Sequence, residues 1–423
     1  MGHGDVQHLK NAIFGKEHDM RNMLLAIMMA MALAACGSIQ NATTDQTSPA
    51  PDEPAQAVDE GEAAPYTATS PADAAIPLGN TAVVFNSDWV VGNLATIGLA
   101  DPATATLARI TTDGGDAVVR SFGNRIYVVN RFGADTIQTI NPADFSVIAN
   151  FSVGGGSNPQ DIAVVSDAKA YVSRLDAHDD ATNADDVLIV NPLTGEQLGS
   201  IDLTPYTADD GDRLARAAQM VIVDGRLYVC MQDLTNAYAV DASGKVAVVD
   251  IDTNEVLEVI ELSGRNPSDI TYSPLTEKFY VANTASYNPF PVIDTSTPYG
   301  GIEVFQRDGD RYIMEGIVLA DETLGGGVAE MRLASATIGY TIVDSMTIAA
   351  FNPTTYAVVD SDVYTSPAMY LPDASVDQDG RLIAAEQDFT DPGVVFLNAD
   401  GSIVAGPTGV GAPPVSITFV DVE

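Results

Sequence analysis

The sequence predicts an all-β fold: a single β-propeller of seven four-stranded blades that spans residues 80–423. Two observations predict the blades, because an apolar run, mostly with tyrosine, and a second run ending mainly in Asn or Asp each recur six times along the chain. Their spacing of about 45 to 50 residues is typical of propeller blades. A third observation predicts that the ring closes, because the two ends of this region carry complementary strands of one further blade.

The recurring runs fit the second and third strands of each blade. Their β-branched and aromatic residues suit half-buried pleated strands, and the turns between them carry Gly, Pro, Asn and Asp. The second-strand runs are 125–130, 169–173, 226–230, 278–283, 340–343 and 381–385. The third-strand runs are 136–141, 187–191, 246–250, 302–306, 347–352 and 394–398.

The seventh blade is predicted from both ends of the region. Residues 415–420 have the pattern of an innermost strand without a blade, whereas 81–86 and 94–110 have the pattern of outer strands without an innermost one. Pairing them closes the ring and leaves no open sheet edge. Six or eight blades remain as alternatives if 80–113 and 321–372 divide differently.

The second-strand runs, such as Arg125-Ile-Tyr-Val-Val-Asn130, resemble those of the YVTN-type β-propellers of bacterial and archaeal surface proteins, which are relatives of WD-repeat propellers. The resemblance covers residues 80–423. It implies the fold and not the function, because the matching residues pack strands. The runs 340–343 and 382–385 depart from the pattern, since they lack the Tyr-Val pair.

An export signal precedes this region. A basic start at 20–22 and an apolar stretch at 23–32 lead to Leu33-Ala-Ala-Cys36, which is the order of a secretory signal. The last four residues, followed by Gly37, resemble the bacterial lipobox, which implies that Cys36 receives diacylglycerol and anchors the mature chain. The absence of aspartate at position 37 points to the outer membrane. An uncleaved N-terminal anchor is the alternative.

These signals divide the chain into three parts. Residues 1–35 are the expected signal peptide, of which 1–19 follow from a misassigned start codon, and residues 36–79 are a lipidated tether too poor in large apolar residues to fold. The formal charge of −39 argues against a nucleic-acid partner, because such a field repels phosphates. The second cysteine, Cys230, lies in a strand-like run and is expected to be buried.

Loop lengths predict which face of the propeller binds a partner. The links after the second and fourth strands share one face, and nearly all insertions fall there: 175–186, 204–216, 232–244, 284–301 and 320–327. Binding residues concentrate on such loops. The candidate residues of this ligand face are Arg131, Arg174, Tyr287, Phe290, Tyr299 and Arg332. Tolerated surface drift is the alternative interpretation of the insertions.

A polar residue is expected in one register just before each innermost strand, around the mouth of the central channel. These residues are Asp116, Asp161, Gln219, Asp269, Glu330, Asp373 and Ser416. Oxygen ligands in this arrangement could hold Ca²⁺ or a polar ligand. The alternative role is structural, with carboxylates that accept backbone N–H bonds and tie one blade to the next.

A second acidic group is a weaker candidate for a cation site. It consists of Asp176, Asp179, Asp180, Asp185 and Asp186, with His178 among them. The spacing differs from an EF-hand, and a solvated acidic loop is the alternative. Motifs of nucleophilic or zinc catalysis do not occur in the sequence. We therefore expect a non-catalytic binding or scaffold module with a protein or glycan partner at the envelope; the alternative is a Ca²⁺-dependent hydrolase of the lactonase-like propeller type.

Overall fold

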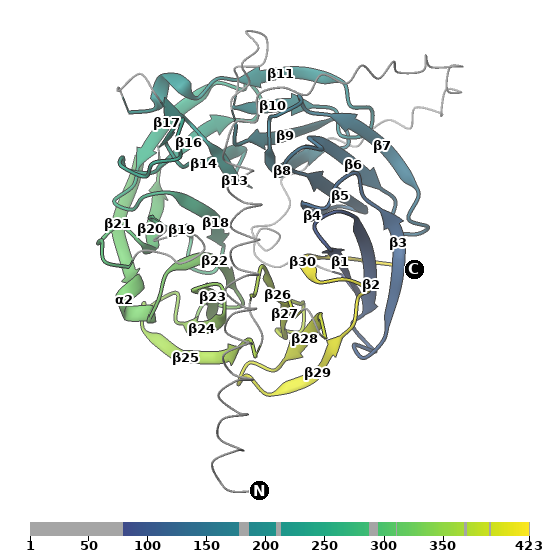
Figure 1. Cartoon of the computed structure of the whole chain (residues 1–423). Coiled ribbons are helices and arrows are strands. Elements are labelled where there is room, and N and C mark those ends of the chain that lie inside the picture. The colour runs from purple at the N-terminus through teal and green to yellow at the C-terminus, as the bar shows by residue number, and fades with distance from the viewer. Residues whose placement is uncertain are drawn as a thin grey trace, which may run out of the picture. The chain divides into compact units, whose positions relative to one another are not determined.

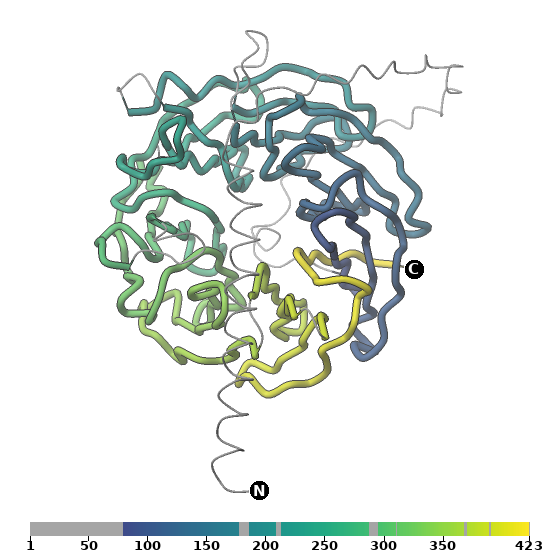
Figure 2. Tube along the Cα trace, in the orientation of Figure 1, coloured from purple at the N-terminus to yellow at the C-terminus, as the bar shows by residue number. Residues whose placement is uncertain are grey.

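Seven antiparallel four-stranded sheets stand around a central axis in the computed structural model (Figure 1). The structure describes residues 79–176, 186–208, 213–286, 295–309, 311–367, 370–388 and 391–422. The chain runs once around the ring, so that neighbouring blades follow one another in sequence (Figure 2). The seven-bladed, all-β architecture predicted from the sequence is confirmed.

The blades are numbered here in chain order, and their strands are given from the axis outward. Blade 1 holds β4 (Ala117–Phe122), β5 (Arg125–Asn130), β6 (Thr136–Ile140) and β7 (Val147–Ser152). Blade 2 holds β8 (Pro159–Ser166), β9 (Lys169–Arg174), β10 (Val187–Val190) and β11 (Gln197–Ile201). Blade 3 holds β13 (Ala217–Val223), β14 (Arg226–Met231), β16 (Lys245–Asp250) and β17 (Val256–Glu261).

The remaining blades follow the same plan. Blade 4 holds β18 (Pro267–Ser273), β19 (Lys278–Asn283), β20 (Gly301–Asp308) and β21 (Arg311–Ala320). Blade 5 holds β22 (Val328–Leu333), β23 (Gly339–Val343), β24 (Thr347–Phe351) and β25 (Val358–Thr365). Blade 6 holds β26 (Ala374–Val376), β27 (Leu382–Glu386), β28 (Gly393–Leu397) and β29 (Ile403–Thr408).

Blade 7 joins the two ends of the propeller. It holds β30 (Pro414–Val420), β1 (Thr81–Ser87), β2 (Gly92–Gly98) and β3 (Ala105–Thr111). In the antiparallel pair of β30 and β1, Thr81 stands opposite Val420. Just outside the pair, the Asn80 backbone N–H donates to Asp421 Oδ1 at 3.1 Å. The closure predicted from the sequence is therefore confirmed.

Buried tyrosines mark the same register in five second strands. They are Tyr127, Tyr171, Tyr228, Tyr280 and Tyr340. In blade 5, Tyr340 stands opposite Arg332 as Tyr127 stands opposite Arg120 in blade 1, although threonine follows Tyr340 where the other four runs have valine. The tyrosine position is therefore kept in blade 5, and only the residue after it departs from the repeated pattern.

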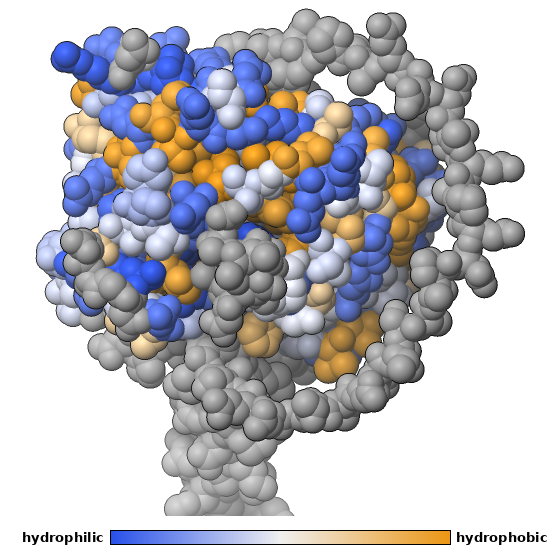
Figure 3. All heavy atoms as spheres, turned by 90° about the horizontal axis from the view of Figure 1, so that it is seen from above, coloured by the Kyte–Doolittle hydropathy of each residue, from blue (hydrophilic) through white to orange (hydrophobic). Residues whose placement is uncertain are grey.

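The outermost strands are the most exposed. The space-filling view of the rim shows apolar residues gathered among hydrophilic ones (Figure 3). The outer strands β7, β11 and β17 contribute the exposed Val147, Leu198 and Leu257. The helical segments Thr204–Tyr206 and Asp321–Leu324 are single turns. Within the described ranges, no helix has the length and apolar character needed to cross a membrane.

Strand direction assigns every link to one of two faces. Because each blade is antiparallel, the links after its second and fourth strands share a face, which we call the insertion-rich face. The links on the opposite face do not exceed six residues, as between β6 and β7. On the insertion-rich face, the link between β19 and β20 covers 284–300, and the short strands β12 (Arg213–Leu214) and β15 (Leu234–Thr235) pair there.

Candidate functional site

The predicted polar ring ties neighbouring blades together through backbone hydrogen bonds. Asp161 Oδ2 accepts the N–H of Met220 in the next blade at 2.9 Å. The same bond recurs from Met331 to Asp269 Oδ2 at 3.0 Å, from Ile417 to Asp373 Oδ2 at 2.7 Å, and from Val119 to Ser416 Oγ at 3.2 Å. The acceptors lie on innermost strands or, for Asp373, directly before one. Four ring residues therefore have the structural role that the sequence left open as an alternative.

The register of this ring departs from the sequence prediction in two ways. Most innermost strands begin earlier than expected, so that Asp161, for example, lies inside β8. Asp116 lies outside the register, because the bond from Val119 places Val118 at the equivalent position of blade 1. Asp116 instead accepts bonds at 2.9 and 2.5 Å from the Nε and Nη2 atoms of Arg131. The prediction failed here because Asp116 precedes two apolar residues, Ala117 and Val118, as Asp161 precedes Ile162 and Ala163 in blade 2.

Two arginines cross-link the ring from equivalent positions in blades 1 and 5. Arg120 donates from Nε to Asp161 Oδ1 in blade 2 at 2.7 Å, and from Nη2 to Gln219 Oε1 in blade 3 at 2.9 Å. Arg332 pairs with three carboxylates, in blades 4, 5 and 6: Asp269 Oδ2 at 3.1 Å, Glu330, and Asp373 Oδ1 at 3.2 Å. Charge-assisted bonds of this kind fix the blades relative to one another.

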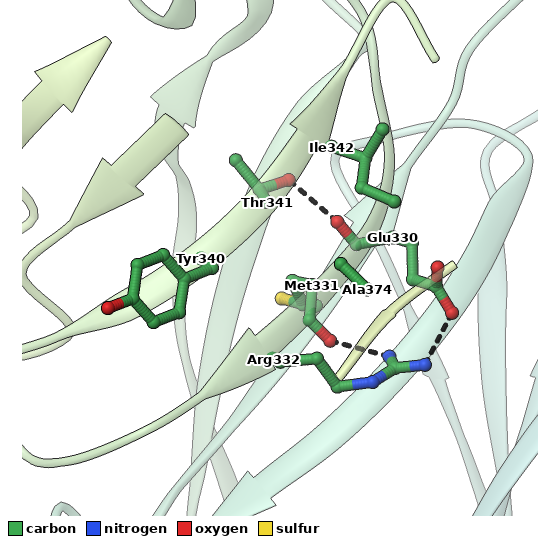
Figure 4. Close-up of a pocket in the computed structure, with 7 residues that line it drawn as sticks. All are labelled: Glu330, Met331, Arg332, Tyr340, Thr341, Ile342 and Ala374. Carbon is green, nitrogen blue, oxygen red and sulfur yellow. Dashed lines mark hydrogen bonds and ion pairs between the residues drawn. The ribbon is translucent and has the colours of Figure 1, made fainter. Parts of the chain in front are cut away.

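Glu330 is the least satisfied carboxylate of this network. One of its oxygens binds Arg332, whereas Oε2 is buried without a hydrogen-bond partner (Figure 4). Burial raises the pKa of Glu330 to about 8, although the charge of Arg332 opposes the rise. Burial also disfavours the charged Arg332, but the neighbouring Glu330, Asp269 and Asp373 outweigh it and raise the pKa of the guanidinium.

A cavity of about 190 Å³ lies on the propeller axis beside this network. Its walls come from the innermost strands or adjoining links of blades 1, 3, 4, 5, 6 and 7, and include Arg120, Gln219, Asp269, Glu330, Asp373 and Ser416. Trp89, Arg131 and Tyr370 contribute from links on the insertion-rich face. The mouth of the channel therefore combines paired charges with aromatic side chains.

The predicted ligand-face residues have different positions. Arg131 pairs with Asp116 and lines the channel cavity, and Arg332 pairs with three ring carboxylates, as described above. Arg174 is buried, and its Nη1 donates to the carbonyl of Val153 at 3.2 Å. The Tyr299 ring carries the Arg265 guanidinium 3.8 Å from its centroid. Tyr287 and Phe290 lie outside the described residues.

The described part of the second acidic group is engaged in the fold. Asp176 accepts hydrogen bonds from Arg216, Tyr238 and Asn158. Asp186 is buried and accepts the N–H of Leu203 at 2.8 Å. Asp179, Asp180, Asp185 and His178 lie outside the described residues. Over the ranges that the structure describes, no three His, Cys, Asp or Glu side chains are grouped to hold a metal ion.

Only one of the two cysteines, Cys230, lies among the described residues. Cys36 lies outside the described residues, so its lipidation stays a prediction from the sequence. Cys230 is a buried free thiol in β14, and burial raises its pKa well above the ordinary value. This agrees with the burial expected for it from the sequence.

Sequence reasoning missed three residues of the channel mouth. Arg120 lies within an innermost strand, and its carboxylate partner belongs to another blade 41 positions away. Trp89 and Tyr370 lie in short links that interrupt the repeated runs. A usable signal was present for Arg120, because Arg332 occupies the equivalent position in blade 5 and was named as a candidate. Trp89 carried another signal, because it is the only tryptophan of the chain.

Fold and site together define a seven-bladed β-propeller with a cross-linked central channel and one elaborated face. Neither the models of known protein families nor the curated proteins include a match to this chain.

Solved structures do match. A functionally unknown protein from Desulfotomaculum acetoxidans DSM 771 is 13% identical over 81% of this chain and 100% of its own, with a TM-score of 0.53. BamB from Moraxella catarrhalis is 15% identical over 73% of this chain and 79% of its own, with a TM-score of 0.44. Apo AztD from Citrobacter koseri is 12% identical over 80% and 97%, with a TM-score of 0.47. At 13% identity, the likeness to the protein from Desulfotomaculum acetoxidans shows the fold alone.

Proposed function

We propose that this protein is a non-catalytic binding or scaffold module of the bacterial cell envelope, which uses the insertion-rich face of its propeller. The observation that carries the proposal is the contrast between the two faces: one has short turns, and the other has the long links and an open channel mouth. Binding residues concentrate on loops that a rigid scaffold holds in place.

The chemistry of the channel mouth supports binding more than catalysis. The ring carboxylates Asp161, Asp269 and Asp373 are engaged in bonds that join blades. Exposed apolar side chains stand on the same face, among them Phe132 in the link between β5 and β6, which is 49% exposed. Such residues on the face where the channel opens offer the contact area that a protein or glycan partner needs.

The cellular location of the module is the second part of the proposal. The lipobox-like sequence at Cys36 supports anchoring of the mature chain through an N-terminal lipid, and Gly37 favours the outer membrane. The anchored propeller then stays at the envelope, and a soluble partner binds it there after diffusing to the membrane.

Site-specific photo-crosslinking in cells tests the use of this face. A photoreactive phenylalanine at Phe132 should give discrete adducts, because this side chain stands on the insertion-rich face. Leu275 provides the matched control, since it is apolar and 67% exposed but lies between β18 and β19 on the opposite face. Adducts at Leu275 and none at Phe132 would contradict the proposal.

A further inference from the structure

The loop between β1 and β2 presents three consecutive apolar residues at the lip of the channel cavity. Trp89 is 39% exposed, Val90 78% and Val91 47%. Trp89 also lines the cavity itself. Single exposed apolar residues are ordinary on protein surfaces, but a contiguous group beside a cavity is typical of a binding surface.

This loop has a fixed shape. Asp88 Oδ1 accepts the N–H groups of Val90 at 2.9 Å and Val91 at 2.8 Å. Gly115 lets the loop approach closely, because a Cβ there would lie 2.4 Å from the carbonyl carbon of Trp89. Trp89 itself has a φ of 69°, which is uncommon for a bulky side chain and persists only where neighbours hold it. A preorganised loop loses little entropy when a partner binds.

The charge at the channel mouth favours a cationic guest. Three arginines stand there, and each is already paired with a carboxylate: Arg120, Arg131 and Arg332. Five carboxylates pair with these arginines, namely Asp116, Asp161, Asp269, Glu330 and Asp373. Three arginines against five carboxylates leave a formal surplus of two negative charges when Glu330 is ionised, and of one when Glu330 carries a proton. An anion would meet no unpaired guanidinium among these groups.

One carboxylate of the cavity wall has an oxygen without a donor. Glu330 lines the cavity, but its Oε2 is closed to solvent, so that the Glu330 side chain must turn toward the cavity before a guest can donate to this oxygen. A buried carboxylate oxygen in this condition is unfavourable unless a donor arrives. The cavity of about 190 Å³ is smaller than the pockets of roughly 300–1,000 Å³ that hold drug-sized ligands, so that it suits one side chain better.

We propose, building on the proposed function, that the partner is a polypeptide segment that places a lysine or arginine beside a bulky apolar residue. The cationic side chain enters the channel cavity and donates to Glu330, and the apolar residue packs on Trp89 and Val90. The inference goes beyond the choice of face because it specifies the chemistry of the partner.

The protonation of Glu330 gives this inference a second readout. Burial raises the pKa of Glu330 to about 8, so that much of this carboxyl carries a proton at neutral pH. A cation that binds beside it favours the ionised form, and binding therefore releases a proton. The charged and titratable groups that face it are Arg332, Asp373, Asp269, Arg120 and Tyr370.

Titration of the full chain with short peptides tests the inference. The probes are acetylated, amidated Gly-Leu-Arg-Leu-Gly and its versions with Gln or Glu in place of Arg, or with Ala in place of both Leu. The readout is the fluorescence of Trp89, the single tryptophan of the chain. We expect saturable binding of the Arg peptide. The other three peptides should bind at least about tenfold more weakly. Calorimetry in two buffers of different ionisation enthalpy should report proton release with the Arg peptide.

Variants assign the effect to the cavity and the loop. Glu330→Gln should weaken the Arg peptide about tenfold and leave the Gln peptide unchanged. Val90→Ser should weaken the binding of every Leu-containing peptide. Because Val90 is exposed, this substitution should leave the fold intact. Glu196→Gln, in the link between β10 and β11 on the opposite face, is the control that should change nothing.

The outcomes separate this inference from the proposed function. Equal binding of the Arg and Gln peptides, or no saturable signal up to roughly 10 mM, overturns the cationic-segment inference. If adducts at Phe132 persist in that case, the proposed function stands and the partner has another chemistry. If those adducts are absent as well, both proposals fail.

Discussion

Asp161 receives Arg120 of blade 1 on one oxygen and the backbone of blade 3 on the other. The Arg120 Nε lies 2.7 Å from Oδ1, and the N–H of Met220 donates to Oδ2 at 2.9 Å. Asp161 itself belongs to blade 2 and is buried. One carboxylate thus joins three consecutive blades at the axis, where side chains of many blades meet.

Replacement of this carboxylate should destabilise the propeller strongly. Asp161→Ala leaves the buried N–H of Met220 without an acceptor and Arg120 without its ion pair, so we expect a loss of about 3 kcal/mol in the free energy of unfolding. Urea denaturation measures it. Asp167→Ala is the matched control, because Asp167 is exposed and 3.8 Å from Arg125, and it should change stability by less than about 0.5 kcal/mol. Equal effects of the two variants would refute the role given to Asp161.

The sequence predicted the blades better than the axis, and the reason is physical. A strand pattern is local, so that runs such as 125–130 and 278–283 identify strands that the structure confirms. Contacts at the axis join blades that are far apart in sequence, as Arg120 and Gln219 do across 99 positions. No local pattern specifies which acid meets which arginine there. For the same reason Asp116 was assigned to a register that Val118 occupies.

The apolar lip of the channel was also beyond a local pattern. The side chains of Trp89, Val90 and Val91 would fit a strand, because their residue types favour one. Asp88 and Gly115 instead hold them in a loop. The loop depends on a close approach of the link between β3 and β4, which leads from blade 7 into blade 1.

Closure of the ring should depend on the last strand. Phe419 in β30 is buried in a cluster that joins blades 6 and 7, together with Phe396 and Ile97. Phe419→Ala removes that ring and opens a cavity, so we expect a loss of about 3–5 kcal/mol. Thermal unfolding followed by circular dichroism measures the change. The exposed Phe132→Ala variant should melt as the wild type does, and a wild-type melting temperature for Phe419→Ala would argue against the closing role of β30.

Asp321 should make the protein less stable as the pH rises. Burial raises the pKa of Asp321 to about 7, whereas the unfolded value lies near 4. The folded state therefore holds the proton longer, and the free energy of unfolding falls between about pH 4 and 7, by up to roughly 1.4 kcal/mol per pH unit. Asp321→Asn keeps the acceptor for the N–H of Val328 and removes the charge, so it should gain stability relative to wild type over this range.

Urea denaturation across this pH range measures the difference between Asp321→Asn and the wild type. Asp144 is the control, because hydrogen bonds from Ser146 lower its pKa and favour its ionised form. Asp144→Asn should therefore leave the fall in stability between about pH 4 and 7 unchanged. A parallel profile for Asp321→Asn and wild type would show that the buried carboxyl does not titrate as described.

Cys36 should determine where the protein resides. If diacylglycerol is attached there, Cys36→Ser moves the chain from the membrane fraction to the soluble exported fraction, because the apolar anchor is lost. Mass spectrometry of the extracted wild type should show a mature chain that begins at a lipid-modified Cys36. Cys230→Ser is the matched control, since this buried thiol lies in β14 and its loss should leave both the lipid and the membrane fraction unchanged. A free thiol at Cys36, or an intact chain that begins at residue 1, would contradict the predicted anchor.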